Sequence, residues 1–332
     1  MKTAGPDTIE LKRTSHHMYD KQSGLVGAGV VAVLMFLGIV CASPLSAQTA
    51  KNVRPLTAKP GENWTIRWNR SDDFNGSQVD WRKWFKKPEQ FGAWSWDNDT
   101  NVSVEGGNLV ITLRRGAASE PAGKEKNGGR KPSPYTSGML KSYAAGVYGY
   151  YEAKIKGTPL FPGASPAFWI YSRIDDSIVE AGKVRYSEID IVELTQRGGA
   201  PGNERISDHN LHAILSNGGA GIRGRVWRRP HNPEFKEAQA NEYRLPFDPR
   251  DEFHIYGCRL DTSDIVWYVD GVEVGRKKNE HWHRRMNVAL SLGLRTPYAK
   301  WENNRLVPNE RNAGEGFPTS MQVDYVRVWE LE

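Results

Sequence analysis

Three carboxylates lie within six residues in the middle of the chain, at Glu188, Asp190 and Glu193. The residues between them are β-branched and favour a strand. Side chains alternate faces along a regular strand, so Glu188 and Asp190 share a face and Glu193, at an odd offset, points to the other. A β-bulge at 191–192 would return Glu193 to the same face. The outer carboxylates could then come within about 5–5.5 Å, a separation that suits a nucleophile and a general acid/base cleaving a glycosidic bond with retention.

The same acidic strand is open to two other interpretations. Carboxylates on one face of a sheet can be solvated. They can also bind a hard cation such as Ca²⁺, which prefers oxygen ligands. The apolar residues around the three carboxylates weigh against a simply solvated face.

Many short strand-like segments, separated by Gly, Pro and Asn clusters, surround this acidic strand. That pattern is typical of a β-sandwich or barrel. Asp270-Gly271, between two apolar runs, predicts a two-residue hairpin. Two long loops are expected at 116–134 and at 299–316, the second carrying Trp301, and long loops on a β frame often hold binding sites. The predicted strands are 108–114, 139–142, 146–156, 167–172, 187–194, 210–215, 252–260, 265–269, 287–294 and 322–331.

The first 47 residues have the features of an export signal. Residues 25–40 form an uncharged apolar run, shorter than the roughly 20 residues of a membrane span. Basic residues precede it, and Leu45-Ser46-Ala47 follows it as a small-residue cleavage site. We expect a signal peptide at 1–47, a linker at 48–59 and one catalytic domain at 60–332. The protein is then secreted, extracellular or periplasmic, and it contacts a membrane only if the N-terminal segment stays uncleaved.

Charge and aromatic content indicate the kind of partner. The chain has 45 Lys and Arg against 39 Asp and Glu, a net charge of +6 that suits an anionic partner. Its 12 Trp exceed what a core of this size needs, and several stand beside polar residues, where they could stack on sugar rings. Interleaved aromatic and basic residues also describe a groove for single-stranded nucleic acid. The export signal and the carboxylate cluster argue against nucleic acid and favour a polyanionic sugar.

From about residue 60 to residue 329 the motifs resemble those of glycoside hydrolase family 16, in the branch that includes the kappa-carrageenases. Agarases, porphyranases and enzymes that cleave furcellaran or beta-carrageenan share the acidic strand with its bulge. The resemblance rests on the segments SDDFNG at 71–76, YGYYEAK at 148–154, PAFWIY at 166–171, EIDIVELTQ at 188–196, WHR at 282–284, LSLGLR at 290–295 and EGFPTS at 315–320.

The resemblance implies an all-β fold, a concanavalin-like β-jelly-roll sandwich of two antiparallel sheets with the substrate in a concave cleft. By position, Glu188 corresponds to the nucleophile and Glu193 to the general acid/base. Asp190 would hydrogen-bond Glu188 and hold the pair in opposite protonation states. The mechanism requires no cofactor. A structural calcium on the convex face, involving Asp324, is a further implication of the family.

The resemblance also implies substrate-binding residues. Trp169 is similar to the platform under the sugar next to the cleaved bond, with a core Trp as the alternative. His209 is expected on the neighbouring strand, where it would bond the substrate or an acidic side chain, or serve as a structural His. Arginine suits sulfate because its planar fork gives bidentate, charge-assisted bonds. The other candidates are Trp94 and Trp96 at distant subsites, and Trp227, Arg229 and Arg295 against sulfated galactose, with a one-residue slip exchanging Arg229 for Arg228.

These implications together predict a monomeric endo-hydrolase that cleaves β-1,4 bonds of a sulfated red-algal galactan, kappa-carrageenan, with retention through a covalent glycosyl-enzyme. The first alternative keeps fold and chemistry but acts on furcellaran, beta-carrageenan, agar or porphyran. The second is a galactan-binding lectin without catalysis. A lectin would be expected to lack Glu188 or Glu193, and both are present.

Overall fold

The computed structural model describes residues 53–116, 133–302, 305–309, 311–312 and 314–332. These residues belong to one compact unit, Thr49–Glu332. The predicted signal peptide at 1–47 and most of the predicted loop at 116–134 lie outside the described residues. Within the described chain no helix is both long and apolar enough to cross a membrane.

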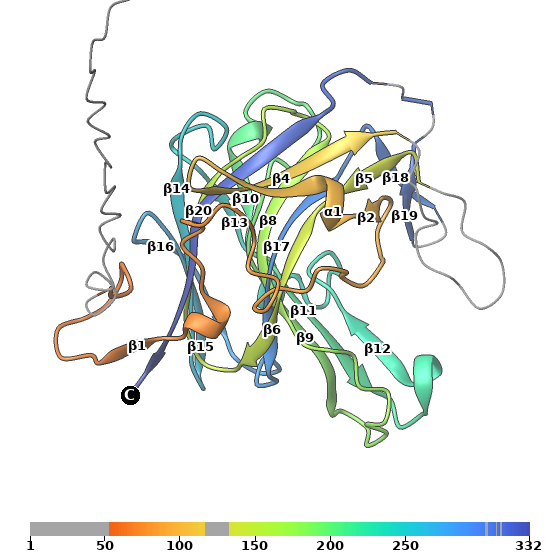
Figure 1. Cartoon of the computed structure of the whole chain (residues 1–332). Helices are drawn as coiled ribbons and strands as arrows, with labels where there is room; N and C mark the ends of the chain where they lie inside the picture. The colour runs from red at the N-terminus through yellow and green to blue at the C-terminus, as the bar shows by residue number, and fades with distance from the viewer. Residues whose placement is uncertain (1–52, 117–132, 303–304, 310, 313) are drawn as a thin grey trace, which may run out of the picture. The chain divides into compact units, whose positions relative to one another are not determined.

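Two sheets stacked face to face form the described unit (Figure 1). The outer sheet runs β16 (Val272–Lys278), β15 (Asp264–Val269), β14 (His254–Leu260), β7 (Gly149–Lys156), β20 (Thr319–Leu331), β4 (Asn108–Arg115), β5 (Tyr135–Ser137), β2 (Ser95–Trp96), with β1 (Trp64–Ile66) on β20 and β3 (Val102–Glu105) on β4. The cleft sheet runs β12 (Arg225–Arg228), β11 (Leu211–Ser216), β9 (Val184–Leu194), β8 (Ala164–Tyr171), β17 (Met286–Leu294), β6 (Met139–Gly146), with β10 (Ile206–Asp208) between β9 and β13 (Glu242–Arg244).

The helices are short and lie in connections. They are α1 (Asn98–Asn101), α2 (Lys236–Gln239), η2 (Trp68–Arg70), η3 (Asn203–Arg205) and η4 (Gly221–Gly224). All strand pairs of the two large sheets are antiparallel except β2 with β5, which is parallel. The predicted all-β jelly-roll sandwich is therefore confirmed.

Each of the ten predicted strands is present, with ends that differ by a few residues. The Asp270-Gly271 hairpin is also confirmed, since both residues have positive φ (47° and 80°), as this turn requires. The prediction of a plain loop at 299–316 is wrong in part. There β18 (Ala299–Glu302) pairs with β19 (Arg305–Pro308), and each segment contains one residue that favours a strand, Trp301 in β18 and Val307 in β19.

The core lies between the two sheets. β9 contributes Ile189, Ile191, Val192 and Leu194 to it, and the outer sheet contributes large side chains such as Trp267, all of them fully buried. Burying such side chains gives about 1.5–3 kcal/mol each. This face of β9 therefore fixes the strand, and its opposite face is left for the site.

Part of the predicted linker contacts the outer sheet. The Trp329 indole Nε1 donates to the Val53 carbonyl at 2.8 Å, and the Leu56 amide donates to Glu152 Oε2 at 3.3 Å. Residues 53–59 are thus held against β7 and β20.

Candidate active site

The acidic strand contains the predicted bulge. β8 and β9 pair Tyr171 with Glu188 and Trp169 with Asp190, and then Phe168 with Val192, so that Ile191 has no partner. Ile191 and Val192 both point into the core. The extra residue returns the next side chain, Glu193, to the face of Glu188 and Asp190, and all three carboxylates line one cleft.

The bulge frees backbone carbonyls, and two buried side chains on its core side satisfy them. Trp267, on β15 of the opposite sheet, donates its Nε1–H to the Asp190 carbonyl at 3.0 Å. His209 Nδ1 lies 2.6 Å from the Ile191 carbonyl, and its Nε2 lies 2.9 Å from the Ser207 hydroxyl. Because a carbonyl only accepts, His209 donates from Nδ1 and accepts at Nε2 as a neutral ring. Burial lowers the pKa of His209 to about 4, in keeping with that state.

His209 therefore lies behind the site and not in it, which corrects the expectation that it contacts substrate or a carboxylate. It is fully buried and absent from the cleft lining. The histidine that lies next to the carboxylates in the cleft is His212, three residues further on, which stands beside Glu188 in the β9–β11 register. Its Nε2 lies 3.2 Å from Asp190 Oδ2 and 3.8 Å from Glu188 Oε1.

Burial and neighbouring charge shape the titration of this cluster. Burial, followed by the charge of Glu193, raises the pKa of Asp190 and outweighs its hydrogen bond with His212. Burial disfavours the charged form of His212, but Glu188 and Asp190 together raise its pKa to about 9. The Tyr186 hydroxyl donates to Glu188 Oε2, and burial raises the pKa of Tyr186 well above its usual value, so it remains a donor. The nucleophile candidate Glu188 is thus oriented by Tyr186 and faces a cation.

Glu193 has a different set of partners. Arg295 donates from Nη2 to Glu193 Oε1 at 2.7 Å, and the Gln196 side-chain amide donates to Oε2 at 3.2 Å. Arg295 directly follows β17, at the end of the strand next to β8. The general acid/base candidate is therefore oriented by an arginine and an amide, while the nucleophile candidate is oriented by a phenol.

The three carboxylates line a cleft with a volume of about 1860 Å³. Trp169 stacks on Tyr171 with ring centroids 4.4 Å apart and donates its Nε1–H to the Ser291 hydroxyl at 3.1 Å. The predicted residues Trp94, Trp96, Trp169, Trp227, Arg229 and Arg295 all line this cleft. Trp94 and Trp96 are only 5% exposed, so each offers the cleft little more than a ring edge.

Of the two neighbouring arginines, Arg229 lines the cleft and Arg228 does not. The Arg229 guanidinium lies over the Trp227 ring at 4.4 Å, and both residues line the cleft. Arg228 points elsewhere, with Nη1 3.1 Å from His281 Nε2 and its guanidinium over Phe235. Within the described chain Arg229 makes no ion pair.

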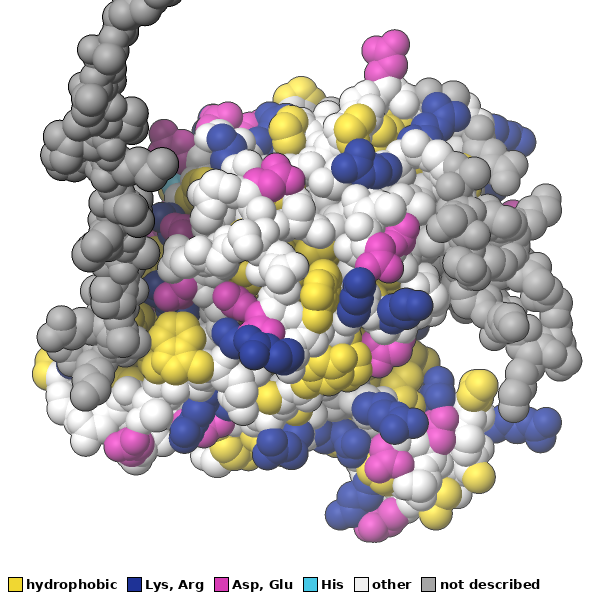
Figure 2. Space-filling model, viewed as in Figure 1, with side chains coloured by type: hydrophobic (Ala, Val, Ile, Leu, Met, Phe, Trp, Pro, Cys, Tyr) yellow, Lys and Arg dark blue, Asp and Glu magenta, His cyan; other side chains and the backbone are white. Residues whose placement is uncertain are grey.

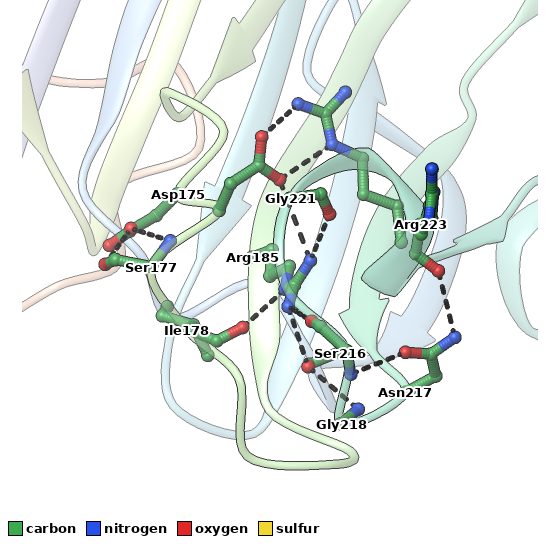
Figure 3. A network of polar contacts seen from close by, with 12 residues as sticks. Asp175, Ser177, Ile178, Arg185, Ser216, Asn217, Gly218, Gly221 and Arg223 are labelled. Carbon is green, nitrogen blue, oxygen red and sulfur yellow. Dashed lines mark hydrogen bonds and ion pairs between the residues drawn. The ribbon is translucent and has the colours of Figure 1, made fainter.

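β12, which brings Trp227 and Arg229 to the cleft, is braced by the polar network in Figure 3. The fully buried Arg185 of β9 donates to the carbonyls of Ile178, Gly219 and Gly221 and to the Ser216 hydroxyl. Asp176 lies 3.7 Å from Arg185 and pairs with Arg225 at the start of β12. The Gly-rich loop 217–224 is thereby tied to the loop 173–183. At the lower right of Figure 2, where these two loops protrude, Lys and Arg side chains (dark blue) lie among Asp and Glu side chains (magenta).

The calcium ion expected at Asp324 stays a prediction. Asp324 Oδ2 lies 2.7 Å from the Lys154 ammonium, so within the described chain this carboxylate pairs with a cation of the protein itself. Among the described residues, Asp324 belongs to no group of three or more His, Cys, Asp or Glu side chains close enough to share a metal; Glu188, Asp190 and His212 do form such a group.

Sequence reasoning missed several cleft residues. Tyr186 lies two positions before Glu188 and so shares its face, a signal that strand periodicity offered. Tyr171, opposite Glu188 on β8, and His212 depend on strand register, which sequence does not give. Phe91, with its ring 6.2 Å from Trp169, comes from a loop and had no local signal.

Comparison with known proteins agrees with this geometry. The family model described as "Beta-porphyranase A-D, GH16 domain" matches residues 64–331. The chain is 47% identical over 283 residues to the kappa-carrageenase of Pseudoalteromonas carrageenovora, covering 84% of this chain and 68% of that protein.

Solved structures show the same relationship. The crystal structure of that kappa-carrageenase in complex with an oligotetrasaccharide of kappa-carrageenan matches with a TM-score of 0.77, covering 85% of this chain and all of the other. A kappa-carrageenase of Zobellia galactanivorans, 41% identical, matches with a TM-score of 0.74 over 84% of this chain. With its bulged carboxylate strand in a cleft, this chain belongs to glycoside hydrolase family 16 and is a glycoside hydrolase.

Proposed function

We propose that the protein is a secreted endo-hydrolase that cleaves the β-1,4 bonds of kappa-carrageenan with retention of configuration. The observation that supports the proposal is the position of Arg295, which donates to Glu193 in the cleft of the three carboxylates and is a side chain able to bind sulfate. The 47% identity to a kappa-carrageenase supports the same substrate.

The first step forms a covalent intermediate. Ionised Glu188 attacks the anomeric carbon, and the bond from that carbon to the leaving oxygen breaks as Glu193 transfers its proton to that oxygen. Tyr186 holds Glu188 Oε2 in place. His212, whose raised pKa keeps it cationic at neutral pH, places its Nε2 3.8 Å from Glu188 Oε1 and so puts a positive charge beside the attacking group.

The second step releases the sugar. Glu193, now deprotonated, takes a proton from water as the water oxygen attacks the anomeric carbon and the bond to Glu188 breaks. Two inversions at the same carbon retain its configuration. Asp190, between the two glutamates and with its pKa raised by burial, can hydrogen-bond to Glu188 as a donor, so that one proton is shared along this face of β9.

Two arginines supply the sulfate recognition in different ways. Arg229 makes no ion pair within the described chain and lies over the Trp227 ring, so its guanidinium is available to an anion. Arg295 must exchange Glu193 for sulfate, or bind both. The other cleft arginine that ion-pairs, Arg197, is occupied by Asp208 and Glu242.

A sister specificity is the main alternative, because the matching family model is described for porphyranases. Reducing-end release by residues 48–332 on kappa-carrageenan, furcellaran, beta-carrageenan and agarose, measured in parallel, tests the substrate. Fastest release from kappa-carrageenan is the expected result, and fastest release from another polymer moves the enzyme to that specificity. Inactivity on all four, with retained binding, would support the lectin.

The remaining parts of the proposal have their own measurements. NMR of the first product should show the β-anomer before mutarotation, whereas the α-anomer would contradict retention. N-terminal sequencing of the exported protein should begin near residue 48, and an intact N-terminus on cell membranes would indicate an anchored enzyme. Light scattering should give a monomer.

A further inference from the structure

We propose that Trp301 forms a sugar-binding platform at a subsite away from the scissile bond. The inference rests on the proposed function in one respect, that the substrate is a polysaccharide longer than the site of cleavage. It assigns a binding role to the β18–β19 hairpin, which reaches the cleft but forms a two-stranded sheet separate from the sheet of the carboxylates.

Trp301 is unusually exposed for its size. Its relative exposure is 66%, the highest of any aromatic residue in the described chain, yet it lines the cleft. Among the described residues its indole makes neither a hydrogen bond nor a ring contact. A large apolar ring left open at the rim of a cleft generally marks a binding surface, and an indole face suits the apolar C–H face of a pyranose.

The hairpin that carries Trp301 is firmly rooted. Tyr298, just before β18, is buried and packs its ring edge against Phe317 at 5.0 Å. The side chains of Asn309 and Asn312, after β19, both donate to the Pro297 carbonyl, at 2.9 and 2.8 Å. Because the base of the hairpin is already fixed, the hairpin loses little conformational entropy when a ligand binds to it.

Cross-strand pairing directs the indole toward the cleft. Trp301 stands opposite Leu306, so the two side chains share a face. Leu306 packs against the core and also lines the cleft. Leu306 therefore anchors that face of the hairpin, and Trp301 extends from it over the open part of the cleft.

The hairpin is also connected to the site through the backbone. The Arg295 carbonyl accepts hydrogen bonds from the amides of Tyr298 and Ala299, at 2.9 and 3.0 Å. The same Arg295 donates from its side chain to Glu193. A sugar ring on Trp301 would thus lie on an element whose base is hydrogen-bonded to the arginine beside Glu193, so the subsite is connected to the site of cleavage through one stretch of backbone.

Length dependence tests the proposal. Trp301→Ala should raise KM about three- to tenfold for oligosaccharides long enough to reach the hairpin, because aromatic stacking contributes about 0.5–1.5 kcal/mol. The shortest cleavable oligosaccharide should show no such rise, and kcat should change little for any length. Trp301→Phe should recover part of the affinity, since a smaller ring still stacks.

Trp68→Ala is the matched control, because Trp68 is also exposed, at 36%, but does not line the cleft. It should leave KM unchanged at every length. Calorimetric titration of the same oligosaccharides into Glu188→Gln and Glu188→Gln/Trp301→Ala gives the binding change without turnover, and melting curves confirm that both proteins are folded.

Equal KM for Trp301→Ala and wild type at all lengths would overturn the platform, as would an equal rise at all lengths. The proposed substrate can fail separately. If wild type prefers another galactan, the length series is run with oligosaccharides of that galactan, and the same two outcomes decide the role of Trp301.

Discussion

The two faces of β9 differ in almost every property although they share one backbone. The core face packs Ile189, Ile191 and Val192 against the outer sheet and receives hydrogen bonds from two buried rings, His209 and Trp267. The cleft face carries Tyr186 and the three carboxylates, and the cationic His212 of the neighbouring strand β11 lies beside them. Since the bulge belongs to both faces, the geometry of the carboxylates depends on groups that no substrate contacts.

The largest expected effect comes from the outer carboxylates of the cleft face. Glu188→Gln and Glu193→Gln should abolish measurable turnover on the preferred polymer, because one removes the proposed nucleophile and the other the proposed proton donor. Both should melt within about a degree of wild type, since the core face is untouched. Reducing-end assays and calorimetry check this.

Glu273→Gln, an exposed carboxylate on β16 of the outer sheet, serves as the control and should keep full activity. Wild-type turnover in either glutamate variant of β9 would contradict the assignment of roles.

The next largest effect is expected from replacing the cleft arginines Arg295 and Arg229, which should lower kcat/KM to different extents. Arg295→Met should lower kcat/KM on a sulfated galactan by about 10- to 100-fold, since a charge-assisted hydrogen bond is worth about 1.5–3 kcal/mol. Arg229→Met should lower it less, because Arg229 contacts no carboxylate of the site. The same assays on a desulfated polymer measure the share due to sulfate.

If Arg295→Met weakens cleavage equally on the sulfated and desulfated polymers, its role is to orient Glu193 and not to recognise sulfate. That result would leave sulfate recognition to Arg229.

A change on the core face should reach the cleft face by way of the bulge. His209→Leu leaves the Ile191 carbonyl without its buried donor, which costs about 1–3 kcal/mol of folding free energy. We expect turnover to fall about tenfold at a temperature where the variant is fully folded, because Glu193 is then displaced. Denaturant unfolding and kinetics measure the two effects.

The effect of His209→Leu on stability can be distinguished from its effect on turnover. A variant that loses stability but keeps full turnover would show that the bulge holds its shape without His209. Trp267→Phe, which removes the donor to the Asp190 carbonyl and keeps an aromatic ring, should behave like His209→Leu with a smaller loss of stability.

The smallest effects are on the pH dependence of stability, where the two histidines act in opposite directions. His212 has a pKa raised from 6.5 to about 9, so its contribution is complete below pH 6.5 and is lost as pH rises through 9. His209 has a pKa lowered to about 4, so its contribution is present above pH 6.5 and is lost as pH falls toward 4.

Melting curves from pH 4 to 10 test this pair. His212→Gln should flatten the alkaline side, although Asp190, whose pKa is also raised, contributes a loss of the same sign. His209→Leu should flatten the acidic side. Identical pH profiles for wild type and His212→Gln would show that His212 is not charged in the folded protein.

Much of this arrangement could be predicted from the sequence, because it rests on local rules. The ten strands follow from period-two patterns, the hairpin from Asp270-Gly271, and the bulge from the odd offset of Glu193. The resemblance to family 16 gave the fold class, which the structure confirms.

The rest depends on tertiary register. His209 and His212 are three residues apart, and only the pairing of His212 with Glu188 decides which one faces the cleft. The contact between Arg295 and Glu193 joins residues 102 apart in the chain, and Trp267 reaches the bulge from the other sheet. Local sequence patterns do not predict contacts between residues so far apart in the chain.

The network around Arg185 has a consequence for how relatives of this protein can diverge. The Arg185 guanidinium donates to carbonyls of the loop 173–183 and of the loop 217–224 at the same time. The position of each loop therefore depends on the position of the other. An insertion in one loop would leave donors unmatched unless the other changed with it. We therefore expect the two loops to coevolve in length, and transplants between family members to succeed only when both are exchanged together.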